Sequence, residues 1–92
     1  MDDRYYDVPG IGDVIVSRHA QERAGKDGIS EDVFTSVLYK GQHLAEGQDI
    51  VWRTGKGIRI VITLDPGPTF DCPLIKTAFR VLPPASIRRY RG

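Results

Sequence analysis

Residues 30–64, SEDVFTSVLYKGQHLAEGQDIVWRTGKGIRIVITL, contain the change of hydrophobic period that decides the fold class. Over residues 33–38 apolar side chains recur at helical spacing, behind Ser30 as a suitable N-cap. Lys40 and Gly41 then supply a cationic last turn and a C-cap glycine. After Gly41 the period shortens to that of strands, so the stretch predicts a helix that leads into a sheet.

The segments after this helix have the apolar patterns of strands and are separated by turn residues. Strands are expected over residues 42–44, 49–53, 58–64 and 74–81. Residues 54–57 contain two glycines and predict a hairpin connection. Residues 65–68, with two prolines and a glycine, predict a turn.

The segment before the helix predicts a turn over residues 9–12, a short strand over 13–17 and a first helix. Residues 18–26 are good helix formers, and glycines end that helix near residues 25–28. Helices followed by a meander of hairpins imply an α+β domain. We expect two short N-terminal helices packed on one face of a small antiparallel β-sheet.

Length and composition indicate a single globular domain, residues 1–92, with a core over about 13–82 and a basic C-terminal tail over 83–92. Hydrophobic residues make up 40% and charged residues 27%, which argues against a disordered chain. No apolar run could span a membrane, and no signal peptide opens the chain. The single cysteine, Cys72, cannot form an internal disulfide, and no Cys/His spacing predicts a metal or cofactor. We therefore expect a cytoplasmic protein, or one delivered into a target cell, without a membrane partner.

Charge is divided unevenly along the chain. Residues 1–52 carry five Lys/Arg against ten Asp/Glu, and residues 53–92 carry eight against two. A positive C-terminal half is typical of a protein that meets phosphates. The alternative is that acidic helices pair with basic strands inside one fold, and both interpretations stay open.

The first predicted helix carries the clearest chemical pattern. His19 and Arg23 lie four residues apart and Lys26 follows three later, so the three share one helical face. Cleaving RNA without a metal needs a base for the ribose 2′-hydroxyl, cations for the phosphorane charge, and a proton donor for the 5′-oxygen. Neighbouring cations disfavour the imidazolium, so His19 could be that base, with Arg23 and Lys26 as cations. In the alternative, His19 packs against the sheet and Arg23 pairs with Glu22 or Asp27.

The expected hairpin is a second candidate site, for binding RNA. Arg53, Lys56 and Arg59 flank glycines whose free N–H groups can cradle a phosphate. Trp52 beside them could stack an RNA base. The alternatives are a plain glycine hairpin with solvated cations and a tryptophan in the core. His43 has no spacing that marks it as a second catalytic histidine.

Two stretches resemble a known family. Residues 17–23, SRHAQER, followed by residues 28–31, GISE, look like the H-A-x-x-R…R-G-I-S opening of certain bacterial toxin domains. These domains belong to the barnase–EndoU–colicin–RelE-like ribonuclease superfamily. Residues 75–80, IKTAFR, are similar to the last core strand of those domains, where a hydrophobic-x-Thr-x-aromatic pattern is usual. The resemblance spans roughly residues 14–81, most of the chain.

The resemblance implies RNA cleavage through a 2′,3′-cyclic phosphate, without a cofactor. It makes His19 the catalytic histidine, Arg23 the phosphate-binding partner, and Thr77 a hydrogen-bond donor in the transition state. Two positions depart from the family pattern. Asp27 stands where a second arginine is usual, and Phe79 stands where some members have a tyrosine that could donate a proton. These departures favour altered chemistry or a relative that only binds.

The last predicted strand adds weaker candidates. Alternation puts Thr77 on one face with Ile75 and Phe79, so a threonine at the edge of the core is the alternative to a catalytic one. Lys76 and Arg80 fall on the opposite face, where they are either solvated or bind an RNA backbone or an acidic inhibitor.

The sequence therefore predicts a metal-independent endoribonuclease domain of the toxin type, with RNA as its substrate. An acidic immunity or antitoxin protein is the expected partner, because a cell that makes such a domain must neutralise it. The alternative is a non-catalytic RNA- or protein-binding module on the same fold, for instance a phage-encoded host-interaction protein.

Overall fold

The computed structural model describes residues 2–81, which form six β-strands and two α-helices. In chain order they are β1 (Arg4–Val8), β2 (Gly12–Val16), α1 (Arg18–Lys26), α2 (Glu31–Lys40), β3 (Gln42–Glu46), β4 (Ile50–Gly55), β5 (Ile58–Thr63) and β6 (Leu74–Arg80). The predicted basic tail over 83–92 lies outside the described residues. No helix within residues 2–81 is long and apolar enough to cross a membrane.

Both helices begin after a serine that caps them. Ser17 Oγ accepts a hydrogen bond from the Ala20 N–H at 3.0 Å, and Ser30 Oγ accepts one from the Val33 N–H at 3.2 Å. Each bond satisfies an N–H that has no partner inside its own helix. The caps explain why α1 and α2 begin where the sequence predicts.

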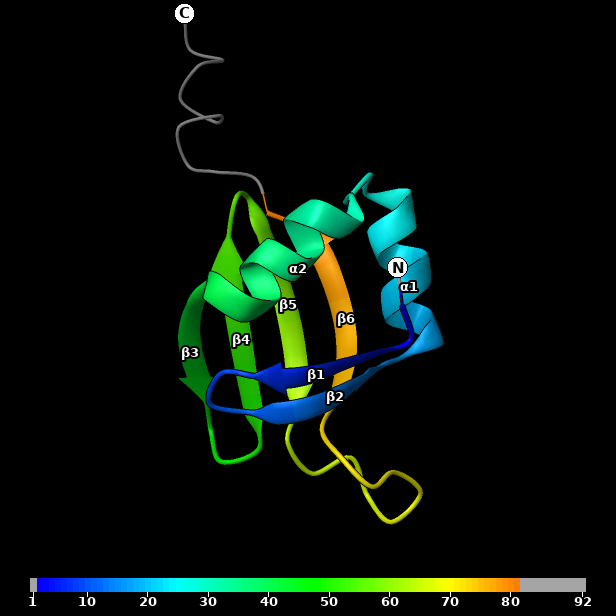
Figure 1. Ribbon diagram of the computed structural model, residues 1–92, viewed down its shortest axis with the longest axis vertical. Helices are drawn as coiled ribbons and strands as arrows, with labels where there is room; N and C mark the ends of the chain where they lie inside the picture. Colours follow the sequence, from blue (N-terminus) through cyan, green and yellow to red (C-terminus); the bar gives the residue numbers. More distant parts are fainter. Residues whose placement is uncertain (1, 82–92) are drawn as a thin grey trace, which may run out of the picture.

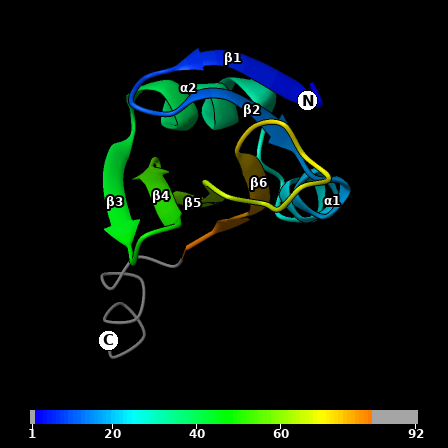
Figure 2. The same cartoon turned by 90° about the horizontal axis from the view of Figure 1, so that it is seen from below.

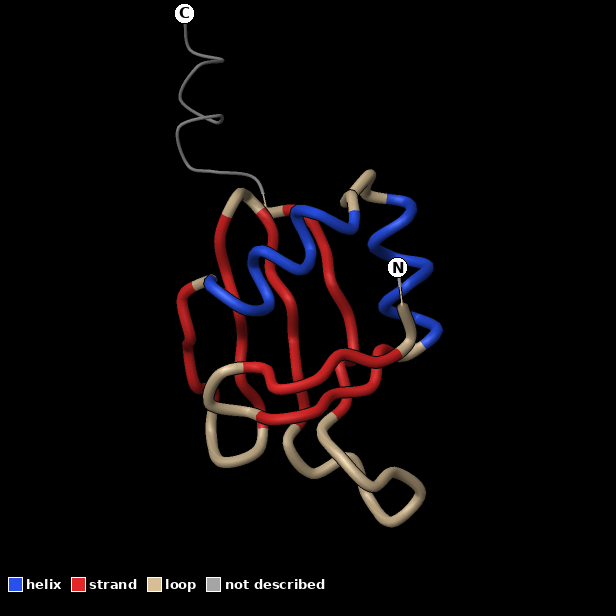
Figure 3. The backbone as a smooth tube through the Cα atoms, viewed as in Figure 1, coloured by secondary structure: helices blue, strands red, loops and turns tan. Residues whose placement is uncertain are grey.

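The six strands form one curled sheet in the order β1-β2-β6-β5-β4-β3. Neighbouring strands are antiparallel except β2 and β6, which pair in parallel. Strands β3 to β6 stand side by side, and the β1–β2 hairpin crosses in front of them (Figure 1, Figure 3). α2 lies inside the curve, between this hairpin and the strands β4 and β5, whereas α1 lies beside β6 (Figure 2).

The core fills the space between the curled sheet and α2. Phe34, Val37 and Leu38 of α2 are buried there. The buried side chains of the central strands are Val51, Ile58, Ile60, Ile62, Ile75 and Ala78. Burial of each large apolar side chain contributes about 2 kcal/mol, so packing rather than helix propensity stabilises α2.

The predicted arrangement, two N-terminal helices on one face of a small antiparallel sheet, is wrong, although the class is α+β. A hairpin precedes the helices, the sheet has six strands, and one pair of strands is parallel. The missed strand β1 has its buried residues, Tyr5 and Val8, three positions apart because the register shifts between them. Asp7 has a φ of 53°, so the segment lacks the period-two pattern of a strand. The core therefore starts at Tyr5, before the expected residue 13.

A bulge in β6 changes which side chains share a face. Ile75 and Thr77, two positions apart, lie opposite successive residues of β5, so Lys76 is an extra residue in the ladder. Ile75 is buried with α2, whereas Thr77 and Phe79 point to the other side of the sheet. The expectation that Ile75, Thr77 and Phe79 share one face is therefore wrong.

Gly41 is the point where the chain turns from α2 into β3, and its surroundings leave no room for a side chain. A Cβ there would lie 2.5 Å from Val37 O and 2.8 Å from Thr54 O. We expect Gly41→Ala to destabilise the fold by about 2 kcal/mol, because backbone atoms must move apart. Urea denaturation measures the change. Gly25→Ala, which enters open space in α1, is the control, and equal losses in both variants would contradict this reason.

Candidate nucleic-acid interface

The side of strands β3 to β6 that faces away from α2, the outer face, carries a cluster of aromatic, cationic and apolar side chains. Directly opposite residues of paired strands point to the same side of a sheet. By this register the cluster consists of Leu44, Trp52, Arg59, Val61, Thr77 and Phe79. The residues that alternate with them, such as Val51 and Ile60, are buried on the α2 side.

Two guanidinium groups lie over aromatic rings at this face. Arg59 Cζ is 4.2 Å from the centre of the Trp52 ring, and Arg23 Cζ of α1 is 5.2 Å from the centre of the Phe79 ring. Each contact is a cation–π interaction. Cations and flat rings therefore alternate across the outer face, an arrangement that suits the bases and phosphates of a single strand together.

Two polar atoms of the outer face, Arg59 Nε and Thr77 Oγ1, are buried without a hydrogen-bond partner among residues 2–81. A buried polar group left unpaired costs about 1–3 kcal/mol, so native proteins seldom keep one unless water or a ligand completes it. Arg59 and Thr77 are diagonal neighbours on β5 and β6, since Arg59 lies opposite Phe79. The two unpaired atoms therefore lie close together beneath the outer face.

α1 runs alongside β6 in the same direction, because side chains near its two ends bond to that strand. Ser17 Oγ donates to Lys76 O at 3.1 Å, and Asp27 Oδ2 accepts from the Arg80 N–H at 2.8 Å. These bonds satisfy backbone groups of β6 beyond its short pairing with β2. α1 is thereby fixed at the margin of the outer face.

His19 and Arg23 project from the same side of α1, one turn apart. Because Arg23 lies over Phe79, this side of the helix borders the outer face. His19 is exposed. Ser17 is bonded to Lys76, and two helical residues rise about as far as one strand residue, so His19 lies at about the level of Thr77 along β6. His19 therefore lies on the side of α1 that borders the outer face, one turn before Arg23.

Asp27 places a negative charge beside Arg23, at the end of α1 that borders the outer face. Its Oδ2 lies 3.5 Å from Arg23 Nε, which is the alternative that the sequence left open for Arg23. The Arg80 N–H, and then Arg23, hold the pKa of the Asp27 carboxyl below its usual range, so the carboxylate is ionised at neutral pH. The Arg80 guanidinium donates to the carbonyl oxygens of Asp27 and Gly28 at 3.1 and 3.2 Å, and so braces the end of α1.

Arg53 does not lie with this group. It is 4% exposed and points to the α2 side of β4. Its Nη1 donates to Leu38 O at 2.8 Å, its Nη2 donates to Pro9 O, and its Nε donates to His43 Nδ1 at 3.2 Å. Arg53 therefore joins β4 to α2 and to the β1–β2 turn. The sequence predicts that Arg53 binds RNA at the hairpin, but its side chain is buried on the α2 side of the sheet.

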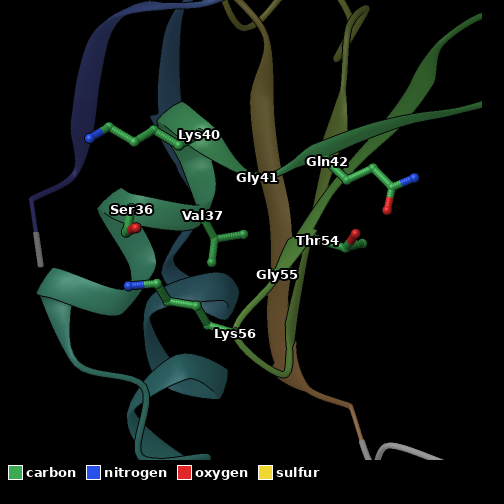
Figure 4. A pocket seen from close by; sticks show the side chains of 8 residues that line it. All are labelled: Ser36, Val37, Lys40, Gly41, Gln42, Thr54, Gly55 and Lys56. Atoms are coloured by element: carbon green, nitrogen blue, oxygen red, sulfur yellow. The ribbon is translucent and has the colours of Figure 1, made fainter.

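The predicted lysines lie away from the centre of the outer face. Lys26 and Lys76 are exposed, at the end of α1 and on the β6 bulge. Lys56 lines a groove of about 280 Å³ at the end of α2, with Ser36, Val37, Lys40, Gly41, Gln42, Thr54 and Gly55. The ammonium ends of Lys40 and Lys56 point to the Ser36 side of this groove, and Gln42 points away from them (Figure 4).

Comparisons of the chain with protein-family models, with curated protein sequences and with solved structures gave no match. The cation–π contacts and the strand register place Arg23, Trp52, Arg59, Thr77 and Phe79 at the outer face, and His19 lies one turn before Arg23 on α1.

Proposed function

We propose that this chain is a metal-independent endoribonuclease domain that binds single-stranded RNA on its outer face. One observation carries the proposal. The unpartnered buried atoms, Arg59 Nε and Thr77 Oγ1, lie between the Trp52 ring and the helix that presents His19 and Arg23. The resemblance of residues 17–31 and 75–80 to toxin ribonucleases agrees with this choice.

The outer face offers separate positions for bases and phosphates. Arg59 covers the Trp52 ring on β4 and Arg23 covers the Phe79 ring on β6, two strands or about 10 Å apart across the sheet, so a different base would stack on each guanidinium plane. Arginine planes stack bases as aromatic rings do, and their N–H groups bind phosphate oxygens. Arg59 would then hold the phosphate that lies between the two bases.

The cleavage step uses the margin at α1. His19 would take the proton from the ribose 2′-hydroxyl, the 2′-oxygen would attack phosphorus, and the bond to the 5′-oxygen would break. The products are a 2′,3′-cyclic phosphate and a 5′-hydroxyl. Arg59 and Arg23 would stabilise the phosphorane charge, with the Thr77 hydroxyl donating to a non-bridging oxygen. Because Phe79 has no hydroxyl, water would protonate the leaving oxygen.

The direct test is incubation of mixed-sequence single-stranded RNA with the full chain in the presence of EDTA. Mass spectrometry is expected to find fragments that end in 2′,3′-cyclic phosphates. Intact RNA, or cleavage that stops when EDTA is added, would contradict the proposed chemistry.

Arg59→Gln is expected to weaken binding of a 2′-O-methyl RNA, which cannot be cleaved, by about tenfold, because it removes both a stacking plane and a phosphate donor. Fluorescence anisotropy measures the dissociation constant. Lys56→Gln removes the same charge from the groove at the end of α2 and is the matched control. Equal losses in the two variants would indicate general attraction between charges and would count against an outer-face site.

Binding without cleavage is the second candidate function. It is favoured by the ion pair of Arg23 with Asp27, which offsets a cation beside His19, and by the missing hydroxyl at Phe79. Saturable binding of RNA to the outer face without any product would select this function over the first.

Asp27→Asn is expected to tighten RNA binding by roughly two- to fivefold, because it frees the Arg23 charge from an exposed ion pair. The amide oxygen of asparagine can still accept from the Arg80 N–H, so α1 stays attached to β6. Glu22→Gln removes one negative charge from the same helix without breaking that pair and serves as the control. The same dissociation constant for both variants would show that the pair does not restrain Arg23.

The proposed partners follow from the same surface. An acidic immunity or antitoxin protein would place carboxylates against Arg59 and Arg23 and compete with RNA for them. The proposed place of action is the cytoplasm, either of the producing cell or of a cell into which the protein is delivered, because the RNA substrate is there.

A further inference from the structure

A second concave site lies at the mouth of the curled sheet, between its two ends. It has a volume of about 390 Å³ and is lined by Pro9 and Gly10 of the β1–β2 turn, Tyr39 and Lys40 of α2, Gly41 after it, and His43 and Arg53 of β3 and β4. Figure 2 shows this turn, the end of α2 and the start of β3 close together. We call this site the mouth pocket. It faces away from the outer face, since Arg53 and Trp52 point to opposite sides of β4.

Arg53 is a buried cation in the wall of the mouth pocket without a carboxylate partner. The only ion pair within residues 2–81 is that of Arg23 with Asp27. The guanidinium instead donates to the Leu38 carbonyl in the last turn of α2. The C-terminal end of a helix carries a partial negative charge of roughly half a unit, so it compensates the Arg53 cation only in part. Burial of a charge without a full counter-charge is costly, which leaves the pocket electrostatically suited to an anion.

The donors that an anion needs are already in place. A guanidinium has five N–H groups, and Arg53 uses three, toward Leu38 O, Pro9 O and His43 Nδ1. Two N–H donors of the guanidinium are therefore not used by its partners among residues 2–81. These three bonds fix the guanidinium before any ligand arrives, so little side-chain entropy is lost on binding.

The rim of the pocket is also positively charged. Lys40, exposed at the end of α2, lines both this pocket and the groove of Lys56, so its flexible side chain must turn from the Ser36 side to reach the mouth pocket (Figure 4). None of the residues that line the pocket is acidic. Two full positive charges, those of Arg53 and Lys40, match the two negative charges of a phosphate monoester near neutral pH. The volume exceeds that of a bare phosphate ion, so an organic group attached to the phosphate could be accommodated beside Tyr39.

We infer that the mouth pocket is a phosphate-binding site, in which the free N–H groups of Arg53 and the ammonium group of Lys40 hold a phosphate monoester. The site is separate from the outer face and does not depend on the proposed ribonuclease activity. Free inorganic phosphate and the terminal phosphate of a nucleotide offer the same chemistry, and the experiment distinguishes them.

The test is titration of the full chain, followed by NMR, with sodium phosphate, adenosine 5′-monophosphate and adenosine, at an ionic strength held constant with sodium chloride. Phosphate is expected to saturate one site and to shift the Arg53 Nε–H resonance. Adenosine should leave that resonance unchanged. Tighter binding of adenosine 5′-monophosphate than of phosphate would identify a nucleotide as the ligand, and equal binding would identify the phosphate group alone.

Two exposed lysines give a matched pair of variants. Lys40→Gln is expected to weaken phosphate binding by about five- to tenfold, because a charge-assisted bond is lost. Lys26→Gln removes the same charge from α1 and should change binding by less than about twofold, because exposed charges at a distance are screened. The inference is overturned if phosphate does not saturate, if the Arg53 resonance does not move, or if both variants bind phosphate equally.

Discussion

His19→Ala is expected to lower the rate of RNA cleavage by about a hundredfold to ten-thousandfold, the usual contribution of a positioned general base. The reason is its place on α1, one turn before Arg23 and at the level of Thr77, where a ribose bound beside Arg59 would present its 2′-hydroxyl. Alanine removes the proton acceptor and leaves the stacking rings and the guanidinium groups in place. RNA binding should therefore change little while cleavage is lost.

The loss must be separated from a loss of folding. His19 is exposed, so its substitution should change the free energy of unfolding by no more than about 0.5 kcal/mol. Urea denaturation checks this. Glu22→Ala, also exposed on α1, is the control for cleavage and is expected to retain activity. A folded His19→Ala variant that cleaves RNA at the wild-type rate would exclude the histidine mechanism.

Arg53→Met has the largest expected effect on stability, a loss of about 3 kcal/mol. The Arg53 guanidinium joins Leu38 of α2, Pro9 of the β1–β2 turn and His43 of β3, so it connects both ends of the curled sheet with the helix inside it. Methionine fills a similar volume but leaves the buried Leu38 carbonyl without its donor and breaks the links to the exposed residues Pro9 and His43. Urea denaturation measures the loss.

Arg59→Met is the matched control for this prediction, because it makes the same substitution on the neighbouring strand. Arg59 has no hydrogen bond to lose at its buried Nε, and methionine can still cover Trp52. The free energy of unfolding of Arg59→Met should fall by less than about 1 kcal/mol, the usual range of a partly exposed cation–π contact. Similar losses for the two variants would show that Arg53 does not have the connecting role that its bonds suggest.

The elements that the sequence predicts well are those with local causes. The helix over 18–26 begins and ends as expected because Ser17 caps it and Gly28 follows it. The strand over 58–63 is apolar enough to be recognised by itself. The β1 strand, by contrast, contains a backbone irregularity at Asp7 that hides its pattern. The parallel pairing of β2 with β6 joins segments far apart in the chain, and no local pattern marks such a pair.

The candidate site was predictable in composition but not in arrangement. His19, Arg23, Arg59 and Trp52 follow from residue types that suit RNA. Thr77 lies on the same face as these residues only because of the bulge at Lys76. A single extra residue in a strand ladder cannot be recognised from an alternating sequence pattern. The burial of Arg53 could not be predicted, because both faces of β4 carry apolar residues and alternation alone does not show which face packs on the core.

The most direct measurement is an NMR map of the full chain bound to a 2′-O-methyl single-stranded RNA. Binding of RNA at the outer face predicts that the Trp52 indole N–H, the Arg59 Nε–H, the Thr77 amide and the His19 ring all shift together as the RNA saturates the site. A bound RNA that leaves these four signals unmoved, or no saturable binding at all, would contradict it.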